Sequence, residues 1–378
     1  MSVTGAPLVG LTHLRAVAIT LVFVYHYRLF AHPAWVERVG AFGWTGVDLF
    51  FVLSGFLISR QLFRAIASTG SFSLREFYFK RALRILPAYL VVVAGYFLFP
   101  WLHEREALPS LWRFLTFTQN FGLDLRTSGT FSHAWSLCIE EQFYLLLPLC
   151  LLALIAVRAG QRASWLLGLM FAMGLVARGL VYLKQLTPLG DSDGFAVAWY
   201  QWIYYPTWGR LDGLLVGIAL AAIYESRESR ESRAFRPALR AALTAHGHWL
   251  LALAVALWAV TFWLFAEPES LTASVLAFPA IAIVYGLLVV AALSPTGLLA
   301  RHSSRLTHWL ATLSYSLYLT HKASIHVAQH QLAKTGLDAS GNAMFVCCIA
   351  ASLLGALALH LAVERPFLRW RDRVLRPR

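Results

Sequence analysis

The sequence predicts an all-α polytopic membrane protein with about ten transmembrane helices and both termini cytoplasmic. Of its 378 residues, 58% are hydrophobic and only 13% are charged, and the mean hydropathy is +0.61. Soluble domains carry about 25% charged residues, so a chain of this composition would expose a large apolar surface to water. In addition, apolar stretches of about 20 residues, the length that crosses a bilayer, recur along the whole chain.

Ten such stretches follow one another, separated by polar connections. They lie at 9–29, 42–62, 83–103, 136–157, 164–183, 199–223, 247–266, 272–293, 306–326 and 343–363. We therefore expect the whole chain, 1–378, to form a single transmembrane domain with no separate soluble domain.

The basic residues indicate the orientation of these spans. Most of the 32 Lys and Arg residues lie in alternate connections and in the C-terminal tail, which the positive-inside rule places in the cytoplasm. Topology thus accounts for the net charge of +13, and no nucleic-acid partner is expected. The threefold ESR repeat at 225–233 is expected to be a solvated connector. The four cysteines lie in apolar stretches without metal-ligand spacing, so no metal is expected.

Arg15 and His26 bound the apolar run of the first span. Because they are eleven positions apart, an ideal helix places them about 20° apart around its axis and about 16 Å apart along it. They would line one stripe at two depths, with Arg15 nearer the cytoplasm. The same pattern is compatible with an arginine that snorkels to the interface and an interfacial histidine.

Asp48 opens the second span, in GVDLFFVLSGFLI (46–58), at a depth expected to match that of His26. Contact between the two would fix the imidazole tautomer, as the carboxylate of a catalytic triad does. A first-turn carboxylate that is stabilised by the helix dipole is the alternative.

Arg81 and Arg84 share one helical face at the cytoplasmic end of the third span, because they are three residues apart. A close arginine pair suits the phosphates of a polyanion such as a nucleotide. Anchoring by the positive-inside rule explains the same cluster.

Other ionisable residues lie within spans, where a charge costs several kcal/mol and needs a cavity or a partner. They are Glu140, Glu141, Arg178, Arg210, Asp212 and His321. The adjacent glutamates point about 100° apart, so one is expected to serve catalysis or an arginine and the other the structure. Arg210 and Asp212 differ by about 200° and should bind partners on other spans. Arg178 could simply snorkel, and His321 could line the same cavity or lie at the interface.

Seven collinear motifs resemble those of the acyltransferase-3 family of bacterial integral-membrane acyltransferases. They are Arg15-x10-His26, GVDLFFVLSGFLI (46–58), FYFKRALRILPAYL (77–90), WSLCIEEQFYLLLP (135–148), GRLDGLLVGIAL (209–220), SYSLYLTH (314–321) and VERPF (363–367). They cover nearly the whole chain.

The resemblance implies a ten-helix enzyme of the bacterial inner membrane that takes an acyl group, commonly acetyl, from cytosolic acyl-CoA. The acceptor would be a hydroxyl, often on an envelope or exported glycan. The family's required Arg and His correspond to Arg15 and His26, and its CoA-associated pair corresponds to Arg81 and Arg84. Its acidic motif in the fourth span corresponds to Glu140 and Glu141, although Cys138 stands where a serine is frequent. Many relatives carry an extra hydrolase-like domain at the C-terminus, whereas this chain ends just after the last span.

These observations suggest a mechanism in which His26, oriented by Asp48, Glu140 or Glu141, takes the proton of an acceptor hydroxyl. Arg15 would steer the donor or stabilise developing negative charge. Covalent acylation of His26, followed by release to the acceptor, is a variant of equal standing.

Two other classes of function remain open from the sequence. A proton-coupled transporter or flippase would use the network Glu140, Glu141, Asp212 and His321, although no inverted five-plus-five repeat is apparent. A sensor or scaffold would not need so many ionisable groups within the membrane. Within the enzyme class, a lipid or a small molecule such as an antibiotic could be the acceptor, and the oligomeric state is left open.

Overall fold

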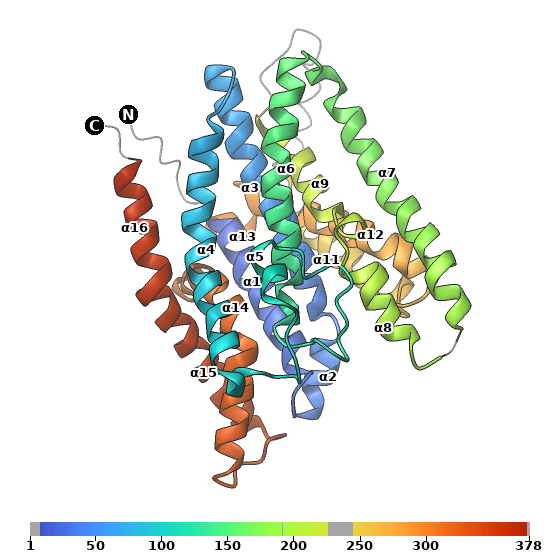
Figure 1. The fold of residues 1–378 in the computed structure, drawn as a ribbon. Coiled ribbons are helices and arrows are strands. Elements are labelled where there is room, and N and C mark those ends of the chain that lie inside the picture. Colours follow the sequence, from blue (N-terminus) through green and yellow to red (C-terminus); the bar gives the residue numbers. More distant parts are fainter. Residues whose placement is uncertain (1–7, 191, 226–244, 376–378) are drawn as a thin grey trace. The chain divides into compact units, whose positions relative to one another are not determined.

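The protein is a bundle of helices that are joined by loops (Figure 1). The computed structural model describes residues 8–190, 192–225 and 245–375, and these contain no β-strand. The long helices are α1 (Val9–Tyr27), α3 (Gly46–Thr69), α4 (Leu74–Leu98), α6 (Trp135–Ala156), α7 (Ala163–Val181), α9 (Asp212–Glu225), α11 (Gly247–Leu264), α12 (Leu271–Leu293), α14 (Arg305–Ala333) and α15 (Asn342–Leu359). The shorter ones are α2 (Ala34–Gly40), α5 (Leu111–Leu115), α8 (Phe195–Trp199), α13 (Leu298–Arg301) and α16 (Arg365–Val374).

The all-α polytopic class is confirmed. Among the described residues, eight helical segments are long and apolar enough to cross a membrane: 9–27, 43–69, 74–98, 132–156, 163–189, 247–264, 271–293 and 342–374. Each overlaps a predicted span. The predicted ninth span lies within α14, whose 29 residues include His321 and Lys322 and are less apolar. Beyond Glu225, the charged connector predicted at 225–233 lies outside the described residues.

The third span begins earlier than its predicted start at residue 83. Ser73 precedes α4 as the N-cap, and its hydroxyl accepts a hydrogen bond from the backbone N–H of Glu76 at 3.2 Å. Ser73 and Glu76 have the spacing of a capping box, a signal that starts a helix ahead of its apolar run. Arg81 and Arg84 therefore lie within a formed helix rather than in the connection before it.

The prediction of one continuous sixth helix at 199–223 is wrong. The segment consists of α8, a π turn at Tyr200–Tyr204, a 3-10 turn at Thr207–Gly209 and α9. Pro206 explains the break, because proline lacks a backbone N–H and disfavours the helical conformation of the residue before it. The break frees the carbonyl of Gly209, which accepts a hydrogen bond from Arg178 Nη1 at 2.7 Å.

The helices group into two compact units. The first contains 1–18, 47–72 and 147–311, and the second contains 19–46, 73–146 and 312–378. The division falls within α1, α3, α6 and α14, so that Arg15 belongs to the first unit and His26 to the second.

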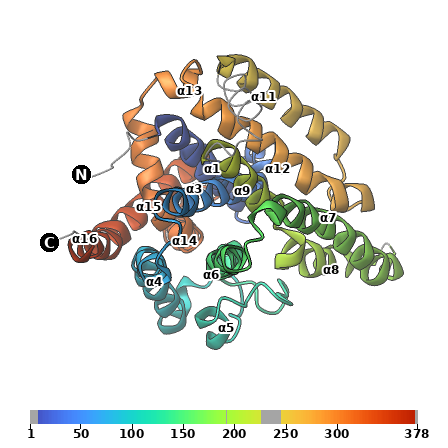
Figure 2. The same ribbon diagram turned by 90° about the horizontal axis from the view of Figure 1, so that it is seen from above.

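In the first unit, glycines allow α3 and α9 to pack backbone against backbone. A Cβ atom at Gly217 would lie 2.5 Å from the carbonyl oxygen of Val52, and one at Gly55 would overlap the carbonyl oxygen of Leu214. Small residues at helix crossings are the usual device for close packing in membranes. In the same unit, α11 lies alongside α12 (Figure 2).

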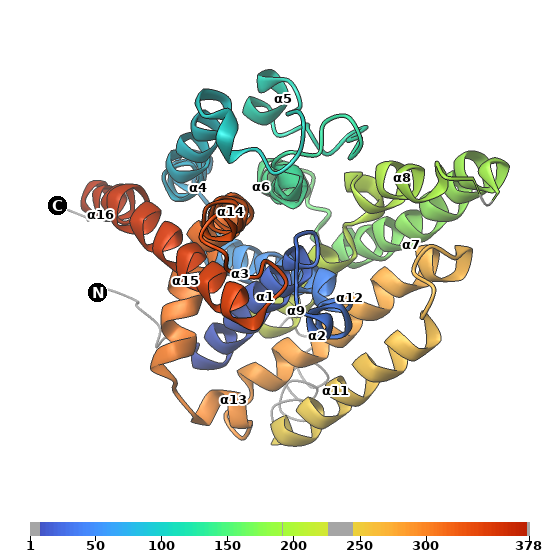
Figure 3. The same cartoon turned by 90° about the horizontal axis from the view of Figure 1, so that it is seen from below.

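In the second unit, an apolar core holds the end of α1 against α2, α14 and α15. It is formed by Phe23, Tyr27, Val36, Ile325, Met344 and Cys348. Viewed from below, α4, α6 and α14 lie next to one another (Figure 3). This core fixes the last turn of α1, which carries His26, beside α14.

The contact at Gly217 predicts a loss of stability on substitution. Gly217→Leu should lower the free energy of unfolding by about 3 kcal/mol or more, because the added side chain meets backbone atoms that cannot move aside. Unfolding of the detergent-solubilised protein, followed by circular dichroism, measures this change. Gly168→Leu on α7 is the matched control, because nothing lies within 4 Å of a Cβ at Gly168. Equal stability of the two variants would contradict the close helix contact.

Candidate active site

Three buried histidines form a cluster in the second unit. The ring centroids of His26 and His321 are 4.9 Å apart, those of His133 and His321 4.9 Å, and those of His26 and His133 5.5 Å. His26 is 8% exposed, His133 2% and His321 0%. We call these three residues the histidine cluster. Buried imidazoles are costly unless they are hydrogen-bonded or used, so the cluster is the candidate active site.

The hydrogen bonds of the cluster fix the tautomers of two of its rings. Nδ1 of His321 lies 3.0 Å from the carbonyl oxygen of Leu317 and 2.9 Å from that of Tyr318, so it must carry the proton. In a neutral ring, Nε2 of His321 is then an acceptor, and it lies 2.8 Å from Nδ1 of His26. His26 therefore donates from Nδ1. Its Nε2 keeps a lone pair and forms no hydrogen bond within the described residues.

The side chain that bonds Nδ1 of His26 is His321, where the sequence analysis expected a carboxylate to orient the ring. Asp48 binds Arg210 instead, with its two oxygens 3.0 and 3.1 Å from Nη2. Oε2 of Glu140 accepts a hydrogen bond from the hydroxyl of Tyr144 at 3.1 Å. His321 is itself held by two backbone carbonyls of α14. The chain of hydrogen bonds that orients His26 therefore ends on the backbone rather than on an anion.

His133 stands in a short 3-10 turn, Ser132–Ala134, directly before α6. The residue before this turn is Phe131, whose φ of 54° is unusual for a bulky side chain. Aromatic packing holds it there, since its ring centroid is 4.6 Å from that of Tyr96 and 5.8 Å from that of Phe114. The carbonyl oxygen of His133 accepts a hydrogen bond from the hydroxyl of Tyr318. The main chain at His133 is thus anchored on both sides.

A buried ion pair supports the same turn. Nζ of Lys322 lies 2.9 Å from Oε1 of Glu104, and it donates to the hydroxyl of Ser132 at 3.3 Å. Oε1 of Glu104 also accepts the backbone N–H of Phe131 at 3.0 Å. Burial alone would raise the pKa of Glu104, but the Lys322 ammonium and these hydrogen bonds hold that pKa below its usual value. The pair ties the turn that carries His133 to the residue next to His321.

In the first unit, the charges within the membrane form ion pairs that neutralise them. Arg178 binds Asp212 through two bonds of 2.7 and 3.1 Å, and the Arg210 guanidinium lies 4.0 Å from the ring centroid of Phe278 as well as on Asp48. The prediction that Arg210 and Asp212 bind other helices is confirmed. The reading of Arg178 as a snorkelling residue is wrong, because it is 1% exposed and fills the gap left by the broken sixth helix. These buried pairs are structural in character.

Arg81, Arg84, Glu140 and Glu141 belong to the second unit. The Arg81 guanidinium lies 5.6 Å from the ring centroid of Tyr144, one turn along α6 from the glutamates. The basic helix α16 packs on the same α4, with Trp370 6.2 Å from Phe79 between ring centroids. Arg81 and Arg84 both lie on α4, three residues apart. Arg15 is half-buried on α1, in the first unit.

Hydrogen bonds join several of the sequence motifs in the second unit. Tyr315 on α14 donates to the carbonyl oxygen of Ile85, next to Arg84, at 2.7 Å. Ser316 donates to Glu364 at 2.8 Å, and Tyr318 lies 2.7 Å from the hydroxyl of Ser136. The SYSLYLTH segment is therefore the common neighbour of the arginine motif on α4, the acidic motif on α6 and the VERPF segment.

The sequence did not single out His133, Lys322 or Glu104. His133 lies two residues before the WSLCIEEQFYLLLP motif (135–148), and Lys322 directly follows His321. Ionisable residues at predicted span ends are ambiguous, because the interface tolerates them. Glu104 and His133 are buried because the 100–134 segment folds back, and no periodicity in the sequence predicts this.

Comparisons with known proteins bear on the family of the chain. A model of the acyltransferase domain of the acyltransferase-3 family matches residues 8–361. YrhL of Bacillus subtilis (strain 168), provisionally a peptidoglycan O-acetyltransferase, is 27% identical over 94% of this chain and 54% of its own. O-acetyltransferase OatA of Staphylococcus aureus (strain NCTC 8325 / PS 47) is 30% identical over 57% of this chain and 34% of its own. Peptidoglycan O-acetyltransferase OatA of Listeria monocytogenes is 29% identical over 56% and 33%.

The chain spans about half the length of the first of these relatives and about a third of the others. No solved structure shows significant similarity to it.

The ion pair beside the cluster predicts a large effect on stability. Lys322→Met should lower the free energy of unfolding by about 3–5 kcal/mol, because it leaves the buried Glu104 carboxylate without its cation. The double variant Lys322→Met/Glu104→Leu should recover most of this loss. Lys80→Met is the control, since Lys80 pairs with Glu76 at the surface and should cost less than about 1 kcal/mol. A Lys322→Met effect as small as that of the control would contradict a buried pair.

Proposed function

Because the chain belongs to the acyltransferase-3 family, we propose that it transfers an acyl group, most simply acetyl, from acyl-CoA to a hydroxyl group of an envelope glycan. The names of the relatives support this choice of group and acceptor, since they are O-acetyltransferases and two of them are named for peptidoglycan. The enzyme acts in the bacterial inner membrane, with the donor reaching it from the cytosol.

The observation that carries the proposal is the tautomer of His26. O-acylation requires a base that removes the proton of the attacking hydroxyl. The chain of hydrogen bonds from α14 through His321 leaves the lone pair on Nε2 of His26, the atom that would receive this proton. His26 is thus the general base, and His321 holds its ring as the aspartate of a catalytic triad does.

The donor side of the site is assigned to arginines. Arg81 and Arg84 bind phosphates of CoA, and the long pantetheine arm extends from them along α14 toward the cluster. Tyr315, bonded next to Arg84, and His321 are six residues apart on α14, a rise of about 9 Å. The sequence motif that Arg15 shares with His26 is the ground for giving Arg15 the role of steering the donor or stabilising negative charge. Glu140 and Glu141 shape the path from the arginines to the cluster.

The ion pairs argue against proton-coupled transport through Asp212. This carboxylate makes two hydrogen bonds with Arg178 and is 4% exposed, so it is not set up to exchange protons with a passing substrate. Of the network invoked for transport, only Glu140, Glu141 and His321 remain, and His321 is committed to His26.

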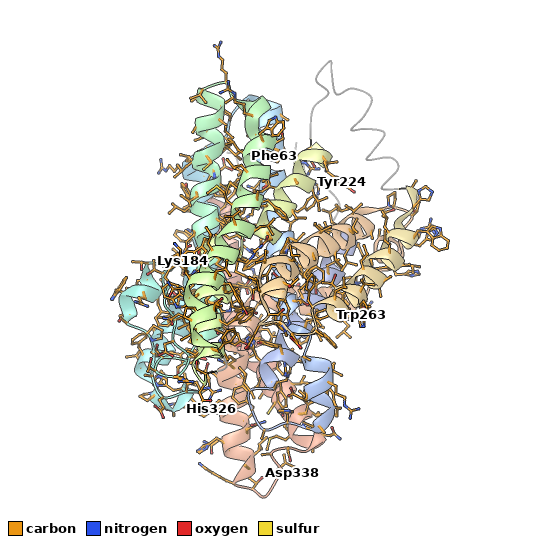
Figure 4. All side chains as sticks on the ribbon, turned by 90° about the vertical axis from the view of Figure 1, so that its right-hand side faces the viewer. Phe63, Lys184, Tyr224, Trp263, His326 and Asp338 are labelled. Atoms are coloured by element: carbon orange, nitrogen blue, oxygen red, sulfur yellow. The ribbon has the colours of Figure 1, made fainter. Side chains whose placement is uncertain are left out.

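The general-base role predicts the outcome of a substitution at His26. In proteoliposomes supplied with labelled acetyl-CoA and a glycan acceptor, His26→Ala should reduce the rate of transfer by at least about 100-fold. The label should remain in acetyl-CoA rather than on the protein. His326→Ala is the control, because His326, labelled in Figure 4, lies on α14 outside the histidine cluster and its ring stacks with that of His330, 6.3 Å away between centroids. Full turnover by His26→Ala would end the proposal, whereas label trapped on His26 of the wild type would favour the covalent variant.

The orienting role of His321 predicts a different kinetic signature. His321→Phe should lower kcat by about 1000-fold or more, because His26 is then free to present the wrong tautomer. His321→Gln keeps a carbonyl acceptor and should retain more activity than His321→Phe. The KM for acetyl-CoA should change little in either variant, since neither contacts the donor phosphates. Similar activity of the Phe and Gln variants would show that hydrogen bonding by residue 321 is not what orients His26.

A further inference from the structure

The side chain of His133 is buried without any hydrogen bond. It is 2% exposed, and neither Nδ1 nor Nε2 has a hydrogen-bond partner in the described parts of the chain. Leaving a buried donor or acceptor unsatisfied costs stability, so native structures seldom retain such a group without a use. A phenylalanine would pack against the same aromatic neighbours at no such cost.

The surroundings of His133 point to a ligand rather than to a structural partner. Its main chain is fixed by Tyr318 and by the turn at Ser132, and its ring packs against Phe131 at 5.0 Å edge-on, Tyr318 at 5.5 Å and the two cluster histidines. A rigid backbone that carries a polar side chain with unused hydrogen-bonding capacity is how binding groups are held.

The other polar groups around the cluster are already engaged. Lys322 binds Glu104 and Ser132, and Ser136 binds Tyr318. His321 binds two carbonyl oxygens and His26. An uncharged imidazole has one N–H donor and one acceptor nitrogen, so His133 supplies the donor that the rest of the cluster does not.

We propose that His133 donates its N–H to the carbonyl oxygen of the acyl group and stabilises the oxyanion formed during transfer. This assignment rests on the proposed acyltransferase function. The ring centroids of His26 and His133 are 5.5 Å apart, a separation at which the two rings reach different oxygens of one reacting centre. Histidine is among the side chains that serve as oxyanion donors, and their effect is large in a site that excludes water.

The reaction balances with these two histidines. The acceptor oxygen forms a bond to the thioester carbon while its proton passes to Nε2 of His26, and the electron pair of the C=O bond moves onto the carbonyl oxygen. That oxyanion accepts the hydrogen bond from His133. When the C=O bond re-forms, the C–S bond breaks, and the CoA thiolate takes the proton from His26. The products are the ester and CoA with a free thiol, and His133 is unchanged throughout.

The test compares His133→Phe with wild type in the labelled acetyl-CoA assay, together with unfolding of both proteins. We expect kcat to fall by about 100- to 1000-fold while the KM for acetyl-CoA and the unfolding transition stay near the wild-type values. His133→Gln and His133→Asn place an N–H near Nε2 or Nδ1, and the one that retains more activity identifies the donating nitrogen. His326→Phe is the matched control, a histidine on α14 outside the cluster (Figure 4).

The outcomes separate this assignment from the proposed function. Wild-type kcat in His133→Phe would mean that the ring meets only a buried water, and would overturn the assignment while leaving the acyltransferase intact. Absence of acetyl-CoA turnover by the wild type would overturn both. If His133→Phe does not fold, His133→Ala with added imidazole serves instead: recovery of turnover supports the donor role, and no recovery overturns it.

Discussion

The candidate site depends on one hydrogen-bonded chain, from the backbone of α14 through His321 to His26. Two carbonyl oxygens fix the proton on Nδ1 of His321, and that choice propagates to the free lone pair on Nε2 of His26. A carboxylate would orient the ring equally well, but it would add a charge that the apolar surroundings disfavour. Using helix carbonyls, which are anchored by the helix itself, gives the same tautomer without an ion in the core.

The buried charged groups of the two units have different surroundings. The first unit pairs its buried charges with one another, Arg178 with Asp212 and Arg210 with Asp48. Those pairs hold together the helices around the broken sixth segment, where backbone carbonyls would otherwise lack donors. The second unit contains the histidine cluster and the pair Lys322–Glu104. Its α4 also carries Arg81 and Arg84.

The three histidines are chemically alike but are given different tasks by their contacts. Within the described residues, both ring nitrogens of His321 form hydrogen bonds, one nitrogen of His26 does, and neither nitrogen of His133 does. This gradation is the basis on which we propose orientation, proton transfer and oxyanion binding for the three rings, in that order. It also explains why the turn at Phe131 tolerates an unfavourable φ, since the aromatic packing that holds it sets the ring of His133.

Composition and helical spacing determined the all-α membrane class, eight of the predicted spans and the helical face shared by Arg81 and Arg84. These features depend only on local hydrophobicity and on residues that are close together in the chain. Spacing also showed that Arg210 and Asp212 cannot bind each other. The sequence did not determine which partners these two residues bind. It also did not show that the sixth helix breaks near Pro206, where Arg178 donates a hydrogen bond to the carbonyl of Gly209. Only the tertiary structure brought His26, His133 and His321 together, since they are 107 and 188 residues apart in order along the chain. For the same reason it alone identified His321 as the partner of Nδ1 of His26: a side chain bonds the group that packing places within about 3 Å, and packing is decided by the whole fold.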